Sequence, residues 1–342
     1  MTPDVKVKVW IGGKDREATL LVHELRWNPI TREWVIIATE RQGRPVLPER
    51  HCPFDPGSSE VPGEYDVLSI PNRFPSLRRD APDCAEADEF FKTAPAAGAC
   101  EVVLYSGNHE TSLGAEPVGH IKKVVDLWQQ RYLDLSREPP VRYVFIFENR
   151  GREIGVTLDH PHGQIYAYPF IPPFIERRLE GARRYHMDTG RCLFCEIIEN
   201  EGRASPSRVI LENDHFIALV PFWAKWSYEV NIYPRRHIGG LDEIGEGEKW
   251  GLAETLKEVL LKYDGLYGFR LPFVMAVHQQ PTGDAGGCDY CHMSVEFYPP
   301  HRSRDRLKYL GGSEIGAGAH INVTSPEEAA DQLRRVQAPD ID

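Results

Sequence analysis

Two stretches of the chain carry apolar residues at the spacing expected of a helix with one buried face. Between Gly119 and Leu135, apolar residues recur at positions 121, 124, 125, 128 and 132. Between Glu246 and Tyr263 they recur at positions 250, 252, 256, 259, 260 and 263. A repeat close to 3.6 residues predicts an amphipathic helix in each stretch. A terminal helix is also predicted from Pro326, because proline suits the first turn of a helix.

The two halves of the chain repeat one order of elements. Each predicted helix follows an apolar run typical of a strand, at residues 102–105 and 230–233. A cysteine and two histidines recur in the same order in each half: Cys52, His109 and His160, then Cys192, His237 and His292. We therefore expect two copies of one α+β unit, at residues 1–170 and 190–342, joined by a charged linker at 171–189. The Pro-, Gly- and Ala-rich stretches 48–63 and 78–100 are predicted to be loops.

Composition narrows the class of protein. The chain has 342 residues, of which 41% are apolar and 27% charged, as in a folded, water-soluble protein. Its formal net charge of −11 disfavours a nucleic-acid partner, which needs a basic surface. No apolar run of about 18 residues and no N-terminal signal sequence is visible, so we expect no membrane span and a cytoplasmic location. Seven cysteines with two Cys-x-x-Cys pairs then favour metal binding over a disulfide framework.

The most informative motif is His160-Pro161-His162-Gly163-Gln164. Alternate side chains of an extended segment point to one face, which places His160, His162 and Gln164 on a single surface. Gly163 is predicted to leave room for a ligand beside the backbone. An imidazole can attack phosphorus, and a neutral amide can hold a phosphoryl oxygen. This set of side chains therefore predicts phosphate chemistry.

The motif resembles the active site of the galactose-1-phosphate uridylyltransferase family, in the branch of the histidine-triad superfamily that has Gln at the third triad position. Further segments resemble motifs of this family in the same order. They are NPITREWVII at 28–37, PNRFP at 71–75, FENRG at 147–151, VPFWA at 220–224 and FYPP at 297–300. The resemblance runs from about residue 23 to about residue 337.

This resemblance implies a fold and a reaction. The expected fold is α+β, with duplicated histidine-triad half-units forming one mostly antiparallel sheet flanked by helices. The expected enzyme is a UDP-glucose:hexose-1-phosphate uridylyltransferase, which moves UMP from UDP-glucose to galactose 1-phosphate. The reaction is expected to be ping-pong, through a uridylyl-histidine intermediate, because a covalent step divides one difficult displacement into two easier ones. A homodimer is also implied.

The resemblance further implies roles for individual residues. His162 is the expected nucleophile, and Gln164 the expected hydrogen-bond donor to the transferring phosphoryl group. Because Gln164 cannot protonate a leaving group as histidine does, a transferase is favoured over a hydrolase. The remaining substrate contacts implied by matching motifs are Arg41, Arg44, Asn72, Arg73, Asn149, Gly155 and Thr157, together with Lys308 and Tyr309 across a dimer interface.

Two structural zinc sites are expected. Cys192 and Cys195 have the spacing with which two thiolates bind one tetrahedral ion. The duplication points to His237 and His292 as their partners, because His109 and His160 match metal positions of the family. The pair Cys288 and Cys291 offers an alternative, a site of four cysteines, and we favour the mixed site.

The first half departs from the usual metal motif. Asp55 stands where the family has a second cysteine, so the expected ligands are Cys52, Asp55, His109 and His160. An oxygen ligand weakens selectivity for zinc, which makes zinc at this site less certain than at the second. A further metal site of some relatives uses two histidines of the second half. Here those positions are Ser294 and Glu296, so that site is not expected, and we predict that the second half is a scaffold.

Three other functions remain open from the sequence. The first is a nucleotide-sugar phosphorylase or adenylyltransferase of the same fold. The second, a non-catalytic zinc-stabilised binding module, is supported only by the cysteines and leaves the second imidazole of the motif without a purpose. The third is a hydrolase of the superfamily.

Overall fold

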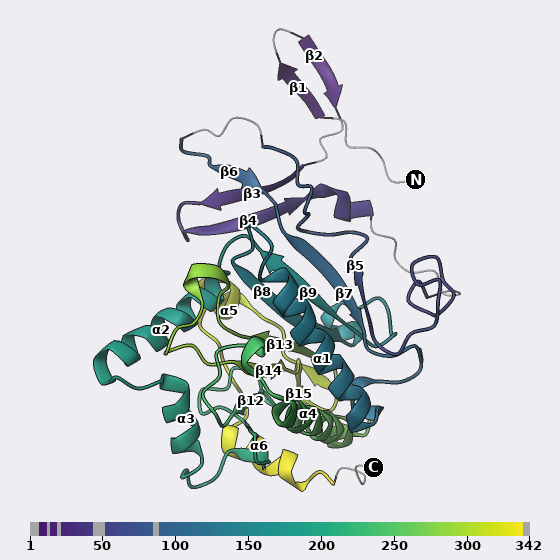
Figure 1. The fold of residues 1–342 in the computed structure, drawn as a ribbon. Helices are drawn as coiled ribbons and strands as arrows, with labels where there is room; N and C mark the ends of the chain where they lie inside the picture. The colour runs from purple at the N-terminus through teal and green to yellow at the C-terminus, as the bar shows by residue number, and fades with distance from the viewer. Residues whose placement is uncertain (1–6, 12–13, 19–21, 44–51, 85–88, 338–342) are drawn as a thin grey trace.

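The computed structural model describes residues 7–11, 14–18, 22–43, 52–84 and 89–337 (Figure 1). This part of the chain has at its centre a nine-stranded sheet in the order β10-β11-β12-β14-β13-β8-β9-β7-β5, in which all neighbouring pairs are antiparallel. Its strands are β5 (Leu68–Pro71), β7 (Ala99–Leu104), β8 (Tyr143–Arg150), β9 (His162–Tyr168), β10 (Val209–Glu212), β11 (Phe216–Leu219), β12 (Val230–Pro234), β13 (Phe273–His278) and β14 (Ser294–Tyr298).

The sheet order shows the duplication directly. From the centre outward, the first half contributes β8, β9 and β7, and the second half contributes β13, β14 and β12. The halves meet where β8 pairs with β13, with Ile146 opposite Val277 and Arg150 opposite Phe273. One sheet therefore runs through both halves, and the expected α+β fold with duplicated half-units is confirmed.

The two predicted amphipathic helices cover one face of this sheet. Helices α1 (Val118–Leu135) and α4 (Glu246–Tyr267) lie side by side across it (Figure 1). Their apolar stripes, including Trp128 and Leu256, are fully buried in one core shared by both halves. The terminal helix α6 (Pro326–Arg335) begins at the predicted proline, and the Ser325 hydroxyl accepts a hydrogen bond from the backbone N–H of Glu328.

The segment predicted as a linker is a helix. Helix α2 (Pro173–Thr189) spans almost all of residues 171–189, and α3 (Leu193–Glu201) follows it. Ion pairs within the helix, such as Glu180 with Arg183, account for the high charge that suggested a linker. Arg178 of α2 contacts Glu296 of β14, so this helix lies against the second half of the sheet.

Smaller elements surround the central sheet. A three-stranded sheet of β3 (His23–Asn28), β4 (Glu33–Ala38) and β6 (Thr93–Pro95) packs above its first half (Figure 1). The predicted loop at 78–100 is thus partly wrong, because β6 and the start of β7 lie within it. The other elements are β1 (Val7–Ile11), β2 (Lys14–Ala18), η1 (Thr39–Gly43), η2 (Leu113–Ala115), η3 (Arg152–Ile154), η4 (Leu241–Glu243), η5 (Gly283–Ala285), β15 (His301–Ser303), β16 (Arg306–Leu307) and α5 (Gly312–Ala317).

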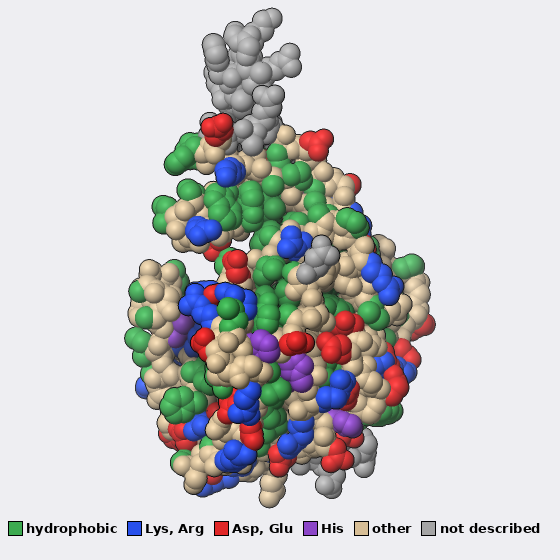
Figure 2. Space-filling view, turned by 60° about the vertical axis from the view of Figure 1, so that its left-hand side comes forward, with side chains coloured by type: hydrophobic (Ala, Val, Ile, Leu, Met, Phe, Trp, Pro, Cys, Tyr) green, Lys and Arg blue, Asp and Glu red, His purple; other side chains and the backbone are tan. Residues whose placement is uncertain are grey.

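Two surface properties bear on partners. Among the described residues, no helix combines the length and the apolar character needed to cross a membrane. On the face drawn in Figure 2, Lys and Arg side chains alternate with Asp and Glu, and no continuous basic patch covers the residues described there.

Candidate active site and metal centres

A cavity of about 730 Å³ opens on the sheet face opposite α1 and α4, over the first half. Four separate segments form its wall: residues 52–60, residues 72–74 after β5, Val102 of β7, and side chains from residues 157–164. The lining includes five of the residues expected to act on substrate, namely Asn72, Arg73, Thr157, His162 and Gln164. The structure thus brings together residues that are up to 92 positions apart in the chain (164 − 72 = 92).

Strand β9 presents His162 and Gln164 to this cavity. Burial alternates along the strand, with Gly163, Ile165 and Ala167 buried on the helix side and the intervening residues partly exposed. The alternation places His162 and Gln164 on one face, as expected for an extended segment. His160 precedes the strand and is 1% exposed, so its surroundings differ sharply from those of His162.

The hydrogen bonding of His162 selects one form of its ring. Nδ1 of His162 lies 2.7 Å from the backbone carbonyl oxygen of His160. A carbonyl only accepts hydrogen bonds, so Nδ1 carries the proton and donates it. In the neutral ring Nε2 then carries the lone pair, which is the form a nucleophile needs.

The space beside Gly163 is filled by protein, which corrects the interpretation of this glycine. A Cβ atom at Gly163 would lie 2.1 Å from the hydroxyl oxygen of Tyr105 and 3.1 Å from the carbonyl oxygen of Phe147. Tyr105 is fully buried and packs against Trp128 of α1. Gly163 is therefore required for the close packing of β9 on Tyr105, on the side away from the cavity.

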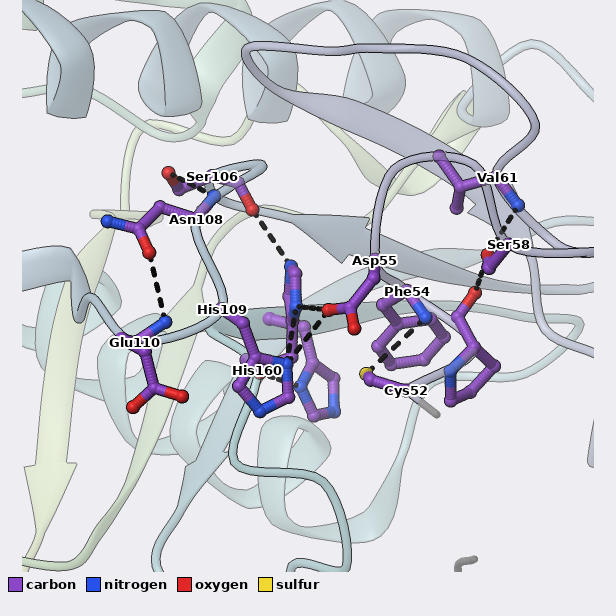
Figure 3. A network of polar contacts seen from close by, with 12 residues as sticks. Cys52, Phe54, Asp55, Ser58, Val61, Ser106, Asn108, His109, Glu110 and His160 are labelled. Atoms are coloured by element: carbon purple, nitrogen blue, oxygen red, sulfur yellow. Dashed lines mark hydrogen bonds and ion pairs between the residues drawn. The ribbon is translucent and has the colours of Figure 1, made fainter. Parts of the chain in front are cut away.

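The expected ligands of the first metal site converge. Oδ1 of Asp55 lies 2.9 Å from Nδ1 of His109 and 3.2 Å from Nδ1 of His160, and the two nitrogens are 3.4 Å apart (Figure 3). Cys52 completes the group, in which all four donor atoms lie within 4.8 Å of one another. Tetrahedral zinc with bonds of about 2.0–2.3 Å requires ligand atoms roughly 3.3–3.8 Å apart, so the donors fit a zinc ion after small shifts.

The surroundings of this group orient its ligands but favour a protonated thiol. Nε2 of His160 donates to the carbonyl oxygen of Ser106 at 2.8 Å, which directs the lone pair of Nδ1 at the group. Burial lowers the pKa of His160 and keeps its ring neutral. Burial raises the pKa of Asp55, but the hydrogen bond from His109 outweighs it and holds that pKa below its usual value. Burial raises the pKa of Cys52 to about 11, so a metal must displace a firmly held proton there.

The second metal group has matching geometry with two sulfur donors. Sγ of Cys195 lies 3.5 Å from Nδ1 of His237 and 3.6 Å from Nδ1 of His292, and Sγ of Cys192 lies 3.8 Å from the latter. Nε2 of His292 lies 3.1 Å from the carbonyl oxygen of Pro234, as His160 does with Ser106. The hydrogen bond with Cys195, followed by that with His292, lowers the pKa of Cys192, so this group already favours a thiolate. The donor set is that of a structural zinc site.

The four-cysteine alternative does not fit this arrangement. Cys288 and Cys291 are joined to each other by a disulfide, and neither belongs to the group that converges with Cys192. The mixed cysteine and histidine group is the one that the structure brings together.

Arg178, which the sequence analysis did not identify, covers the sheet face on which Ser294 and Glu296 lie. The guanidinium of Arg178 donates to Oε1 of Glu296 at 2.6 Å and to the Ser294 hydroxyl at 3.0 Å. Tyr298 also donates to Glu296, at 2.6 Å. Burial raises the pKa of Glu296, but the charge of Arg178 outweighs it and lowers that pKa to about 2. The carboxylate is therefore fully ionised and paired inside the protein.

Other expected substrate residues lie outside the wall of the cavity. Nη1 of Arg41 donates to the carbonyl oxygen of Phe74 at 2.6 Å, next to the lining residues Asn72 and Arg73. Arg73 pairs with Glu60, also a lining residue, at 3.2 Å. Arg44 lies outside the described residues. Asn149, Gly155, Lys308 and Tyr309 are described but do not belong to the lining of this cavity.

Phe54 is a further lining residue that the sequence did not identify. Its ring lies 5.2 Å from that of His162 in an edge-to-face contact. The sequence places Phe54 between Cys52 and Asp55, but only the fold shows that its ring contacts that of His162.

Comparisons with known proteins agree with this geometry. The family model "Galactose-1-phosphate uridyl transferase, N-terminal domain" matches residues 14–172, and the corresponding C-terminal domain matches residues 178–341. A galactose-1-phosphate uridylyltransferase of Thermotoga maritima is 44% identical over 92% of this chain and 98% of its own length. The enzyme of Rattus norvegicus is 34% identical, over 91% of this chain and 86% of its own.

Solved structures show the same relationship. A structure described as a uridylyltransferase has a TM-score of 0.84 and 34% identity, covering 92% of this chain and 98% of its own. An ADP-glucose phosphorylase from Arabidopsis thaliana, solved with bound ADP-glucose, has a TM-score of 0.72 and 27% identity, covering 92% of this chain and 100% of its own. With both halves matched and these identities over nearly the whole length, the chain belongs to the galactose-1-phosphate uridylyltransferase family.

Proposed function

We propose that this protein transfers UMP from UDP-glucose to galactose 1-phosphate, with His162 as nucleophile. The observation that carries the proposal is the Nδ1 hydrogen bond of His162 to the His160 carbonyl, within a cavity large enough for a nucleotide sugar. The names and identities of the relatives support the choice of substrates.

The reaction proceeds in two displacements. Nε2 of His162 attacks the phosphorus that carries uridine, the bond from this phosphorus to the bridging oxygen breaks, and glucose 1-phosphate leaves as an anion. A phosphate oxygen of galactose 1-phosphate then attacks the same phosphorus and releases His162 with its lone pair restored. Gln164, on the same face of β9, donates its amide N–H to a non-bridging oxygen and stabilises the charge that develops there.

The metal groups have a structural role in this proposal. Zinc would be held by Cys192, Cys195, His237 and His292, and by Cys52, Asp55, His109 and His160, with no ligand position left for substrate. Bound zinc fixes the loops that carry its ligands. Residues 1–170 supply the reacting side chains, residues 171–189 join the halves, and residues 190–342 act as the scaffold.

We also propose that the enzyme is a homodimer in which Lys308 and Tyr309 reach the partner's active site. Within its own chain, Nζ of Lys308 donates to the carbonyl oxygens of Lys225 and Ile321, and Tyr309 is 80% exposed. Exposed apolar side chains follow this pair along the chain, at Leu310, Ile315, Ile321 and Val323. Light scattering should give twice the monomer mass, and Tyr309→Ser should raise the KM for the sugar phosphate. A wild-type monomer with full activity would exclude this arrangement.

A second candidate is a phosphorylase that splits a nucleotide sugar with inorganic phosphate, as the named activity of the Arabidopsis relative suggests. The higher identities of the uridylyltransferases favour the first reaction. Incubation of the enzyme with UDP-glucose plus galactose 1-phosphate, and separately with ADP-glucose plus phosphate, distinguishes the two. We expect turnover only in the first mixture.

The test of the nucleophile uses UDP-glucose alone. We expect a burst of glucose 1-phosphate equal to the enzyme present, and an acid-labile uridylyl group on the protein. His162→Ala should abolish both while the circular dichroism spectrum stays unchanged. A label that persists in His162→Ala, or a wild type that never forms one, would refute the mechanism.

A further inference from the structure

Phe54 lies between the first metal group and the ring of His162. Its side chain is 6% exposed, and its ring meets the His162 ring edge-to-face, with centroids 5.2 Å apart and planes inclined at 61°. The residues on either side of the Pro53–Phe54 pair, Cys52 and Asp55, both supply donor atoms to the metal group. The same short segment therefore holds a metal and touches the nucleophile.

The backbone of Phe54 is fixed by the same group of residues. Its N–H donates to Sγ of Cys52 at 3.4 Å (Figure 3). Its carbonyl oxygen accepts a hydrogen bond from the Tyr65 hydroxyl at 2.9 Å. That hydroxyl also lies 2.7 Å from Nε2 of His160. Movement of the metal ligands would thus be passed to Phe54 through direct contacts.

The hydrogen bond from Nδ1 to the His160 carbonyl sets the position of one ring atom. The edge-to-face contact with Phe54 bears on the inclination of the ring plane, on which the direction of Nε2 depends. An in-line displacement requires Nε2 to face the phosphorus opposite the leaving oxygen, and a misplacement of about 1 Å can cost on the order of 10²-fold in rate. Phe54 lies against the ring whose inclination sets this direction.

We propose that Phe54 is a positioning residue, which holds the His162 imidazole in its attacking orientation and makes that orientation depend on the metal group around Cys52 and Asp55. The proposal rests on the function proposed above, in which His162 is the nucleophile. Under this proposal the first metal group affects the rate of uridylylation through the orientation of His162, without any contact between the metal and the substrate.

The second half contains a matched residue without a nucleophile. Phe194 occupies the same place within Cys192-Leu193-Phe194-Cys195, and its ring lies 5.8 Å from that of His292. It also stacks on the Arg178 guanidinium, 5.2 Å from the ring centroid. In the second half, Ser294 stands at the position of His162. Phe194 therefore contacts a possible metal ligand, His292, and the covering residue Arg178, but no nucleophile. Phe194→Leu is therefore the control for Phe54→Leu.

The first experiment measures uridylylation of zinc-loaded enzyme by UDP-glucose in a single turnover. We expect Phe54→Leu to lower the rate constant at saturating UDP-glucose about 10-fold or more, with a smaller change in the half-saturating concentration and unchanged metal content. Phe194→Leu should keep the wild-type rate constant within about twofold, whatever it does to stability. A loss confined to the half-saturating concentration, or equal losses in the two variants, would overturn the positioning role.

The second experiment tests the dependence on the metal group. Cys52→Ser should lose one metal ion and also slow uridylylation, and the double variant Cys52→Ser/Phe54→Leu should be no slower than the slower single variant, because both changes act through the same ring. Additive losses would show that the two act separately and would refute the coupling.

A third readout does not need substrate. In nitrogen-15 NMR of the ligand-free protein, the wild-type His162 ring should give narrow signals of a single ring form, and Phe54→Leu should broaden or shift these signals, because the inclination of the ring is no longer fixed. Identical spectra would contradict the proposal even where the wild type is active. Absence of uridylylation in a wild type with a single ring form would instead refute the proposed function.

Discussion

Each half of the protein contributes three central strands, one long helix over them and a group of four possible metal ligands, yet the opposite face of the sheet differs between the halves. In the first half, His162 and Gln164 line a cavity of about 730 Å³. In the second half, Ser294 and Glu296 are buried beneath Arg178 of α2. The duplicated fold thus retains a shared core and a group of four possible ligands in each half, whereas one sheet face is open in the first half and covered in the second.

The largest expected effect is the loss of stability when Arg178 is removed from the covered face of the second half. Arg178→Ala leaves the carboxylate of Glu296 buried without its partner, and breaking a buried ion pair in this way costs about 3–5 kcal/mol of unfolding free energy. Urea denaturation measures the loss. The double variant Arg178→Met/Glu296→Gln should recover most of it, because no charge is then left buried. A single variant as stable as the wild type would show that the second half does not need this closure.

A second test compares the equivalent positions in the two halves. Gln164→Ala should lower kcat by about 10²–10³-fold, the usual cost of one donor to a developing negative charge. Ser294→Ala should stay within about twofold of the wild type, since its hydroxyl contacts Arg178 and Glu296 inside the protein. Steady-state kinetics with both substrates saturating measures the kcat of each variant. A loss of about 10³-fold in Ser294→Ala, roughly 4 kcal/mol, would make the second half catalytic.

The closed face of the second half should also be sensitive to acid, because it includes His278, which pairs with Ser294 across β13 and β14 and whose Nε2 lies 3.7 Å from Oε2 of Glu296. Burial lowers the pKa of His278 to about 4 from the ordinary value of about 6.5, so between these values the unfolded chain binds a proton that the folded protein refuses. Stability is therefore lost as pH falls through this window, by about 2 kcal/mol at pH 5. Glu296, whose pKa is lowered to about 2, keeps its contribution until the pH falls below its ordinary value of 4.5.

The matching measurement is the difference in unfolding free energy between pH 7 and pH 5. His278→Leu should lose less stability over this interval than the wild type, because it lacks the histidine that must stay neutral. All other groups are the same in both proteins, so their contributions cancel in the comparison. Equal losses would contradict the assignment of this window to His278.

The smallest effect is expected from a substitution that makes the first metal group resemble the second. Asp55→Cys supplies a second sulfur donor beside Cys52, which suits zinc better than a carboxylate oxygen. Zinc release to a chelator should slow on the order of tenfold from this group and stay unchanged from the group of Cys192 and Cys195. Faster release from the first group would show that its geometry is built for an oxygen ligand.

Much of this architecture could be predicted because it depends on local patterns. The apolar stripes that predicted α1 and α4 reflect one buried face in each helix, and the repeated order of cysteine and histidine follows from the duplication. Such signals lie within a few residues or recur at similar spacing, so no knowledge of the packing is needed to see them.

The features that were missed depend on contacts between distant segments. The helical state of residues 173–189 was not predicted for the segment that joins the halves, and nothing in its sequence shows that Arg178 reaches Glu296, 118 residues away. Gly163 was predicted to make room for a ligand, whereas Tyr105 fills that space from the other side of the sheet. In both cases the partner is supplied by tertiary packing, which local sequence does not encode.

The pairing of β8 with β13 at the centre of the sheet means that neither half is complete by itself. If residues 1–170 were produced alone, β8 would become an unprotected edge with its backbone N–H and C=O groups facing water. These unpaired groups can form hydrogen bonds with a strand of another chain, so the isolated fragment would aggregate or pair with a copy of itself. Supplying the second half as a separate polypeptide would satisfy the same edge, which makes split-gene complementation across the α2 segment a natural outcome of this fold.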